Sequence, residues 1–205
     1  MTTTRHLALL ADGTSDRALL PILAWLVRDL APMTTFAEPS FAVRDTRRPL
    51  AAEVERIVAL HRPDLTFVHR DAENADPADR RREIPRAIGI VPVVPVRMTE
   101  AWLLLDEKTI RRAADRPNGR EPLDLPPLSR LEALADPKQR LHDLLLTAAA
   151  VTGRQRKRFV AGLPLRVQRT TELLTDFQPL RRLPAFQQLE ADCREAVARW
   201  QAPSA

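Results

Sequence analysis

Short apolar runs alternate with helical patterns about every 25 to 30 residues in the first half of the chain, and this alternation constrains the fold more than any other feature. The first run covers residues 7–11 and ends in Asp12-Gly13-Thr14. Residues 16–30 follow with apolar side chains at helical spacing. A strand, a turn and a helix are therefore predicted, and their repetition is typical of parallel βαβ units with right-handed crossovers.

The same pattern continues to about residue 97. Residues 65–69 predict a further strand, and residues 90–96 predict another, which Pro92 and Pro95 restrict to a sheet edge or to a bulge. A weaker strand is expected over 36–43, where Pro39 interrupts it, and helices are expected over 50–60 and 76–88. We therefore predict an α/β fold with a parallel sheet and flanking helices.

Strand patterns end at Met98. Helices are predicted over residues 98–105, 107–114, 128–134, 137–151, 155–160, 165–174 and 184–200, with a hinge in the proline-rich segment 117–127. These patterns predict an α/β domain over residues 1–115 and a helical C-terminal region over 116–205 packed on it. Within them Trp102, Leu103 and Leu105 are expected in the core, because that run is too apolar for a solvated helix.

Several classes of protein are excluded by simple features. The longest apolar run has ten residues, well short of the roughly 20 that cross a bilayer. The apolar stretch near the N-terminus is too short for the core of a signal peptide, so a cytoplasmic location without membrane association is expected. One cysteine, Cys193, forms neither an internal disulfide nor a thiolate zinc site. Any metal site must therefore depend on carboxylates.

The net charge of +5 is concentrated in one part of the chain. Between residues 153 and 182 eight basic side chains face two acidic ones, and the run Arg154, Arg156, Lys157, Arg158 is the densest part. This surface suits the phosphates of a nucleic acid, and a solvated helix face is the alternative. Tyrosine is absent and aromatic residues make up 4 % of the chain, so contact with the backbone of a duplex is favoured over base stacking.

Acidic residues follow the predicted strands. Asp12 and Asp16 come after the first strand, Asp71 and Glu73 after the strand at 65–69, and Glu100 after the one at 90–96. Because the carboxyl ends of parallel strands meet at one edge, these side chains are expected to converge in a cleft. Grouped carboxylates are the ligands that Mg²⁺ prefers. As alternatives, each of these acids is an ordinary turn, helix-start or surface residue.

Other interpretations of the same segments are less favourable. Asp12-Gly13-Thr14 is not a haloacid-dehalogenase motif, because the position of the nucleophile holds Leu10. No glycine-rich Gly-Lys-Ser/Thr segment is present, which excludes a P-loop. Among the four histidines, His69 lies next to the acidic group and is a candidate general base; the alternative is that it faces a helix.

Two segments resemble Toprim domains. Residues 9–16, Leu-Leu-Ala-Asp-Gly-Thr-Ser-Asp, resemble the first Toprim motif, in which a strand ends in a Glu-Gly-x-x-Asp-like turn, and residues 70–73, Arg-Asp-Ala-Glu, resemble the Asp-x-Asp motif. Residues 96–106, which contain Glu-Ala-Trp-Leu-Leu, and Asp-Pro-Lys at 136–138 are similar to a Toprim-like family of small bacterial proteins, domain-of-unknown-function family four-two-seven-six. This resemblance touches most of residues 5 to 160.

The resemblance implies a function. Toprim proteins cut, join or polymerise nucleic-acid strands with Mg²⁺ or Mn²⁺, so Asp12, Asp71 and Glu73 are the expected catalytic and metal-binding residues, with Asp16, Glu100 and His69 as additional candidates. A nuclease or related phosphodiester-processing enzyme that acts on nucleic acid in bacterial defence, beside an ATPase partner, is the expectation. The alternative is a catalytically inactive binding or regulatory module, which is favoured by Asp12 in place of the motif's glutamate and Glu73 in place of its second aspartate.

Overall fold

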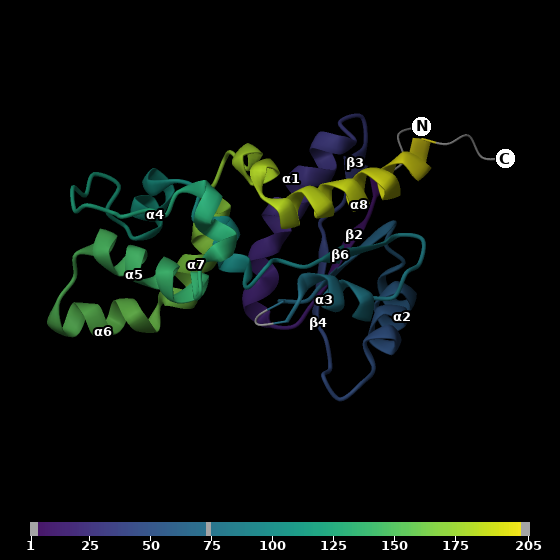
Figure 1. Ribbon diagram of the computed structural model, residues 1–205, viewed down its shortest axis with the longest axis horizontal. Helices are drawn as coiled ribbons and strands as arrows, with labels where there is room; N and C mark the ends of the chain where they lie inside the picture. Colours follow the sequence, from purple (N-terminus) through teal and green to yellow (C-terminus); the bar gives the residue numbers. More distant parts are fainter. Residues whose placement is uncertain (1–3, 73–74, 202–205) are drawn as a thin grey trace.

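A four-stranded parallel sheet forms the centre of the molecule (Figure 1). The structure is a computed structural model that describes residues 4–72 and 75–201. In order across the sheet the strands are β4 (Ser40–Val43), β2 (Leu7–Ala11), β5 (Leu65–His69) and β6 (Ile90–Val93). All three pairings are parallel, which confirms the predicted fold class.

Helices cover both faces of this sheet. Leu9 and Phe67 face a core that includes α1 (Leu19–Leu30) and α8 (Pro184–Gln201), and these two helices pack against one another. Leu10 and Val68 face the opposite side, where they pack with α2 (Leu50–His61) and the end of α3 (Pro77–Glu83). Because both faces are covered, the two central strands are apolar throughout rather than alternating.

Prolines shape the two sides of the sheet as the sequence indicates. The expected strand over 36–43 is divided around Pro39 into β4 and a short β3 (Thr35–Phe36), which pairs in parallel with β1 (Thr4–Arg5). β6 is an edge strand. The backbone N–H groups of Thr66 and Arg70 donate to the carbonyls of Gly89 and Val93, so the nitrogen of Pro92 faces away from the sheet, where no partner strand needs an N–H.

The second half of the described chain is helical and forms a lobe beside the sheet (Figure 1). This lobe contains α4 (Glu107–Ala113), α5 (Pro137–Ala149), α6 (Gly153–Ala161) and α7 (Leu163–Leu173). Short 3₁₀ turns connect the parts of the molecule: η1 (Thr14–Ala18), η2 (Thr99–Leu103), η3 (Leu128–Ala133) and η4 (Gln178–Arg182). None of the helices described here is long and apolar enough to cross a membrane.

Two helices predicted from the sequence, over 98–105 and 128–134, are 3₁₀ turns instead. In each case an aspartate caps a new helix immediately downstream. The Asp106 carboxylate accepts hydrogen bonds from the backbone N–H groups of Lys108 and Thr109, and Asp136 accepts one from Gln139. The caps fix where α4 and α5 begin, and the short segments before them have no room for a regular α-helix.

One continuous core joins the sheet to the helical lobe, with buried residues from Leu7 to Val197. α8 returns from the lobe to pack on α1 and β6, whereas α4 lies in the lobe. The two lobes visible in Figure 1 are thus joined through α8, and the predicted boundary between residues 115 and 116 stays a prediction.

Trp102 is a central residue of this core. Its side chain is fully buried, as is that of Leu103, while Leu105 is half-buried. The Trp102 ring meets Phe186 of α8 edge to face, with ring centroids 5.4 Å apart. The indole N–H has no hydrogen-bond partner among the described residues. Trp102 thus holds η2 against the C-terminal helix by packing alone.

We expect Trp102→Ala to lower the free energy of unfolding by about 3–5 kcal/mol, because it leaves a large cavity. Trp102→Phe should cost less than half of that, since it keeps an aromatic ring against Phe186 and the N–H that it removes has no partner. Urea denaturation of both variants measures the difference. Equal losses for the two variants would contradict the packing interpretation.

Candidate acid–histidine centre

The carboxyl ends of β2, β5 and β6 meet at one edge of the sheet, next to the helical lobe. η1 follows β2 and packs against α7, and η2 follows β6 and packs against α5. The side chains that leave these strand ends are therefore enclosed from the side by helices of the lobe. This is the position where ligands bind in open parallel sheets.

His69, the last residue of β5, is at the centre of this edge. Its side chain is fully buried. Nδ1 lies 3.2 Å from Oδ2 of Asp16, and Nε2 lies 3.2 Å from Oδ1 of Asp71 and 3.3 Å from Oγ1 of Thr99. Asp16, His69 and Asp71 each offer a ligand atom within 4.8 Å of the others. We call these three residues the acid–histidine centre.

Nδ1 of His69 is a buried nitrogen that makes no hydrogen bond to any described residue. Although Oδ2 of Asp16 is near enough, it lies off the N–H direction and accepts instead from the backbone N–H of Gly13, at 2.8 Å. His69 and Asp16 therefore form an ion pair whose geometry departs from that of a well-directed hydrogen bond. A buried polar atom without a well-directed partner can gain one from a ligand.

The charges of the centre depend on one another. Burial lowers the pKa of His69, but the two carboxylates more than offset this and raise it to about 9. For Asp16, burial raises the pKa, and the interaction with His69 together with the Gly13 N–H outweighs it, so that this pKa is lowered. At neutral pH the centre thus holds an imidazolium between two carboxylates.

Glu100, on η2, is the third acid at this edge. Its side chain is buried, and burial raises its pKa, with the negative charges of Asp71 and Asp16 adding to the effect. Lys138, on α5, opposes the shift through its positive charge. Glu100 therefore keeps its proton to a higher pH than an exposed glutamate does.

Asp12 has other partners. Its Oδ1 accepts a hydrogen bond from Nε of Arg44 at 2.5 Å, and its Oδ2 accepts one from Nε of Arg70 at 3.0 Å. The structure thus brings Asp71 together with His69 and Asp16, and it places Asp12 in an arginine cluster instead. Glu73 lies outside the described residues, and its predicted role stays a prediction.

The central position of His69 and Asp16 was not predicted from the sequence, where both were secondary candidates. One signal was available: His69 and Asp71 are two residues apart at a strand end, so that their side chains leave on the same side. The contact with Asp16 had no such signal, because it depends on how η1 folds back beneath β5.

The basic run Arg154, Arg156, Lys157, Arg158 lies on α6, as predicted, and all four side chains are exposed. Within the described parts of the chain none of the four forms an ion pair. α6 contacts α5 and α7 and lies at the outer end of the helical lobe (Figure 1), away from the acid–histidine centre.

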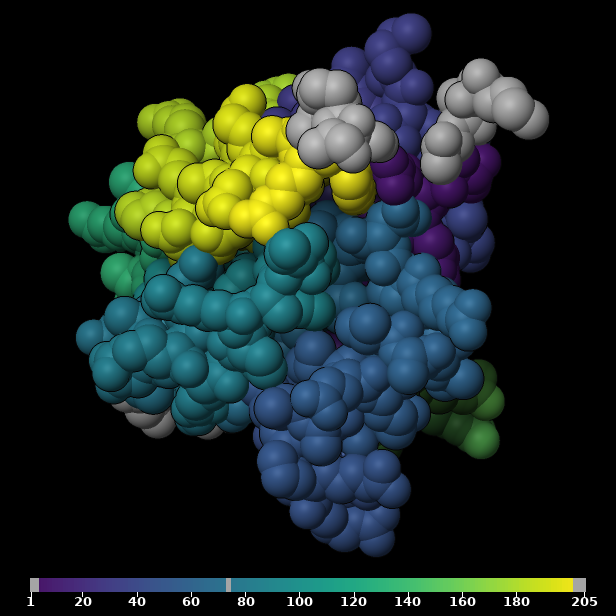
Figure 2. Space-filling view, turned by 90° about the vertical axis from the view of Figure 1, so that its right-hand side faces the viewer, coloured from purple at the N-terminus to yellow at the C-terminus, as the bar shows by residue number. Residues whose placement is uncertain are grey.

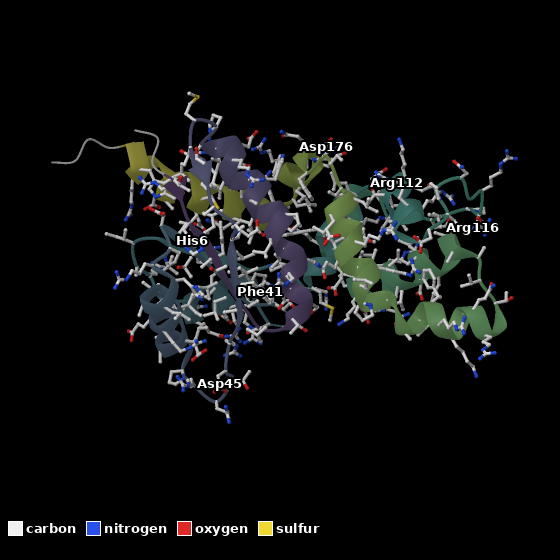
Figure 3. All side chains as sticks on the ribbon, turned by 180° about the vertical axis from the view of Figure 1, so that it is seen from behind. His6, Phe41, Asp45, Arg112, Arg116 and Asp176 are labelled. Carbon is white, nitrogen blue, oxygen red and sulfur yellow. The ribbon has the colours of Figure 1, made fainter. Side chains whose placement is uncertain are left out.

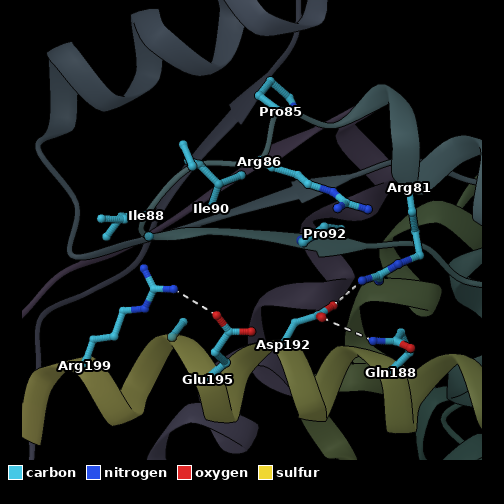
Figure 4. Close-up of a pocket in the computed structure, with 13 residues that line it drawn as sticks. Arg81, Pro85, Arg86, Ile88, Ile90, Pro92, Gln188, Asp192, Glu195 and Arg199 are labelled. Atoms are coloured by element: carbon cyan, nitrogen blue, oxygen red, sulfur yellow. Dashed lines mark hydrogen bonds and ion pairs between the residues drawn. The ribbon is translucent and has the colours of Figure 1, made fainter.

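A groove of about 760 Å³ runs between α8 and the edge strand β6. Figure 2 shows the face of the molecule on which α8 lies beside the segment that contains β6, and Figure 4 shows the side chains that line the groove. Arg81 pairs with Asp192 at 2.5 Å and Arg199 with Glu195 at 2.8 Å, so the charged groups of these pairs neutralise one another. The groove lies apart from the carboxyl ends of the strands, and Pro92 deprives its floor of an N–H.

Comparison with protein-family models, with curated proteins and with solved structures finds no match to this chain. The case for a function therefore depends on the geometry of the acid–histidine centre and of the residues around it.

The charge state of His69 predicts a pH dependence of stability. Because its pKa is about 9 in the folded chain and about 6.5 in the unfolded chain, the stabilisation is complete below pH 6.5 and is lost as the pH rises through 9. The free energy of unfolding should fall by about 3 kcal/mol over this range. Urea denaturation between pH 6 and 9.5 measures it. The same fall in His69→Gln would show that another group is responsible.

Proposed function

We propose that this protein is a divalent-metal-dependent phosphodiesterase that acts on nucleic acid. The observation that carries the proposal is the grouping of Asp16, His69 and Asp71, whose ligand atoms lie within 4.8 Å of one another, with the buried Glu100 near enough for both aspartates to raise its pKa. Carboxylates that must lie this close together are stabilised by a divalent cation, and such sites are typical of phosphoryl transfer.

The donor set distinguishes between the two expected metals. Asp16 and Asp71 offer oxygens and His69 offers a nitrogen. Imidazole is an unusual ligand for Mg²⁺ but a common one for transition metals, so this mixed set suits Mn²⁺ better than Mg²⁺. A bound metal would polarise a phosphoryl oxygen and lower the pKa of a water ligand.

The other roles belong to the chain itself. His69 must give up a proton before one of its nitrogens can act as a ligand, and a bound cation would then supply the positive charge that the imidazolium provides between the two carboxylates. Burial raises the pKa of Glu100, which makes it the better suited of these acids to give a proton to the leaving oxygen. Thr99 fixes the ring of His69 through the contact between Oγ1 and Nε2. Asp12, held by two arginines, orients cations rather than moving protons.

A second candidate function has its own support. The imidazolium of His69 already neutralises one of the two carboxylates without any metal, and Asp12 forms ion pairs with Arg44 and Arg70. A binding or regulatory module with no catalysis would have the same arrangement. The action beside an ATPase in bacterial defence extends the proposal and is supported by the sequence resemblance alone.

Metal binding separates the two candidates. Isothermal titration with Mn²⁺ should show one site, and Asp71→Asn or His69→Asn should weaken binding by about 100-fold because each removes a ligand. Glu55→Gln, which changes an exposed carboxylate on α2, is the matched control. The same variants should abolish cleavage of plasmid DNA or RNA with Mn²⁺. Mn²⁺ binding without cleavage would favour the binding module, and no Mn²⁺ binding would contradict the proposed metal centre.

The basic run on α6 gives a separate prediction. If Arg154, Arg156 and Arg158 bind the phosphates of a duplex, their joint change to glutamine should lower the slope of log affinity against log salt by about 0.9 for each phosphate that is no longer neutralised. Stability should hardly change, since the three side chains are exposed. Affinity for duplex DNA, measured from low to moderate salt, tests this. Parallel slopes would assign this face to solvent or to a protein partner.

A further inference from the structure

Two arginines at the carboxyl edge of the sheet converge on one carboxylate. Arg44 follows β4, Arg70 follows β5, and Asp12 follows β2, the strand between them. Nε of Arg44 donates to Oδ1 of Asp12 at 2.5 Å, and Nε of Arg70 donates to Oδ2 at 3.0 Å. We call these three residues the arginine clamp.

The backbone makes this arrangement rigid. The N–H of Arg44 donates to the carbonyl of Ala11 at 2.9 Å, and that of Arg70 donates to the carbonyl of Val93 at 3.1 Å. Each arginine therefore continues the hydrogen bonding of the sheet by one residue, and its side chain starts from a fixed point. The two side chains are only 17 % and 12 % exposed, so neither is a freely moving surface group.

The clamp has an excess of positive charge. Two guanidinium groups, those of Arg44 and Arg70, share the carboxylate of Asp12. Arg70 also pairs with Glu83, but Glu83 pairs with Arg80 as well, so it does not cancel the excess positive charge. The loop after β4 extends beyond the sheet, with Asp45 at its tip in Figure 3, and Arg47 in this loop pairs with Asp45 at 2.8 Å, so Arg47 adds no unpaired charge to the clamp. Guanidinium groups form strong, directional hydrogen bonds to phosphate oxygens, so an excess of them at one place suits an anion.

Both arginines retain unused donors. A guanidinium has five N–H groups. Across residues 4–72 and 75–201 the side chain of Arg44 donates only through Nε, and that of Arg70 uses Nε and Nη1, the latter with Glu83. The remaining Nη groups are not sealed in the interior without a partner. Guanidinium groups held by Nε present such donors in the geometry that suits phosphate oxygens.

The clamp and the acid–histidine centre lie on opposite sides of the same strand end. Side chains alternate along β5, so that Phe67 and His69 face the core beneath α1, while Val68 and Arg70 face the side of α2 and α3. A ligand that touches both must cross the edge of the sheet with at least two anionic groups.

We propose that the arginine clamp binds a backbone phosphate of a nucleic-acid duplex next to the phosphate that lies at the acid–histidine centre, with Asp12 as the positioning residue for both arginines. This inference rests on the proposed function and names the residues that bind the phosphates of its substrate. It places this phosphate contact at the carboxyl edge of the sheet rather than on the exposed face of α6. Asp12 then has a purpose that does not require a metal.

The test uses the full chain without metal and a fluorescent duplex DNA oligonucleotide. Affinity is measured against salt for the wild type, Arg44→Gln, Arg44→Lys and Arg28→Gln. Arg28 is the matched control, because it is an exposed arginine near the end of α1, on the opposite side of the sheet from the clamp. Circular dichroism shows that each variant is folded, and titration with Mn²⁺ shows whether the acid–histidine centre is intact.

Arg44→Gln should weaken DNA binding about tenfold and lower the salt slope by about 0.9, which is the value for one phosphate neutralised by one arginine. Arg44→Lys should fall between it and the wild type, because lysine keeps the charge but not the planar fork. Arg28→Gln should bind as the wild type does, and Mn²⁺ binding should be unchanged in all four proteins.

The other outcomes are distinct. Equal DNA binding by Arg44→Gln and Arg28→Gln, with Mn²⁺ binding intact, overturns the clamp and leaves the proposed metal centre standing. Absence of Mn²⁺ binding with DNA affinity that still depends on Arg44 overturns the metal centre and supports the clamp. Inorganic phosphate that competes as well as the oligonucleotide, at equal phosphate concentration, overturns the claim that the ligand is a strand.

Discussion

The parallel pairing of β2 with strands on both of its sides is the constraint on which the rest of the molecule depends. All five residues of β2 are buried, so the strand has to be covered on both faces. Neighbouring parallel strands require crossover connections, and the helices in these connections cover the two faces of the sheet. The same pairing directs the carboxyl ends of β2, β4 and β5 to one edge. Every candidate functional residue on the sheet follows from that direction.

Charges that collect at this edge have to be balanced, and the structure does this in two separate ways. On the side of α1 and the helical lobe, the imidazolium of His69 lies between Asp16 and Asp71. On the side of α2 and α3, Asp12 lies between two guanidinium groups. The first group is acidic and buried, and the second is basic and within reach of solvent. An edge that is acidic on one side and basic on the other suits a metal-bound phosphate with further phosphates beside it.

The helical lobe contributes to the centre by enclosing it. α7 packs against η1, which carries Asp16, and α5 packs against η2, which carries Glu100. Burial by these helices raises the pKa of Glu100 and brings Lys138 near it. Trp102 and Phe186 link η2 to α8, so the same core that stabilises the fold also fixes one wall of the site. Stability and site geometry are therefore not independent in this protein.

The sequence by itself determined the α/β class, the parallel sheet and the strand at Leu65–His69, and it restricted β6 to a sheet edge or a bulge, because periodicity and proline act locally along the chain. It also determined that acids follow the strands. Only the tertiary structure decided which partner each of these acids has. Asp12 and Asp16 are four residues apart, and no local pattern indicates that Asp12 pairs with Arg44 and Arg70 while Asp16 pairs with His69. Those partners are distant in sequence and become neighbours only when β2, β4 and β5 are paired.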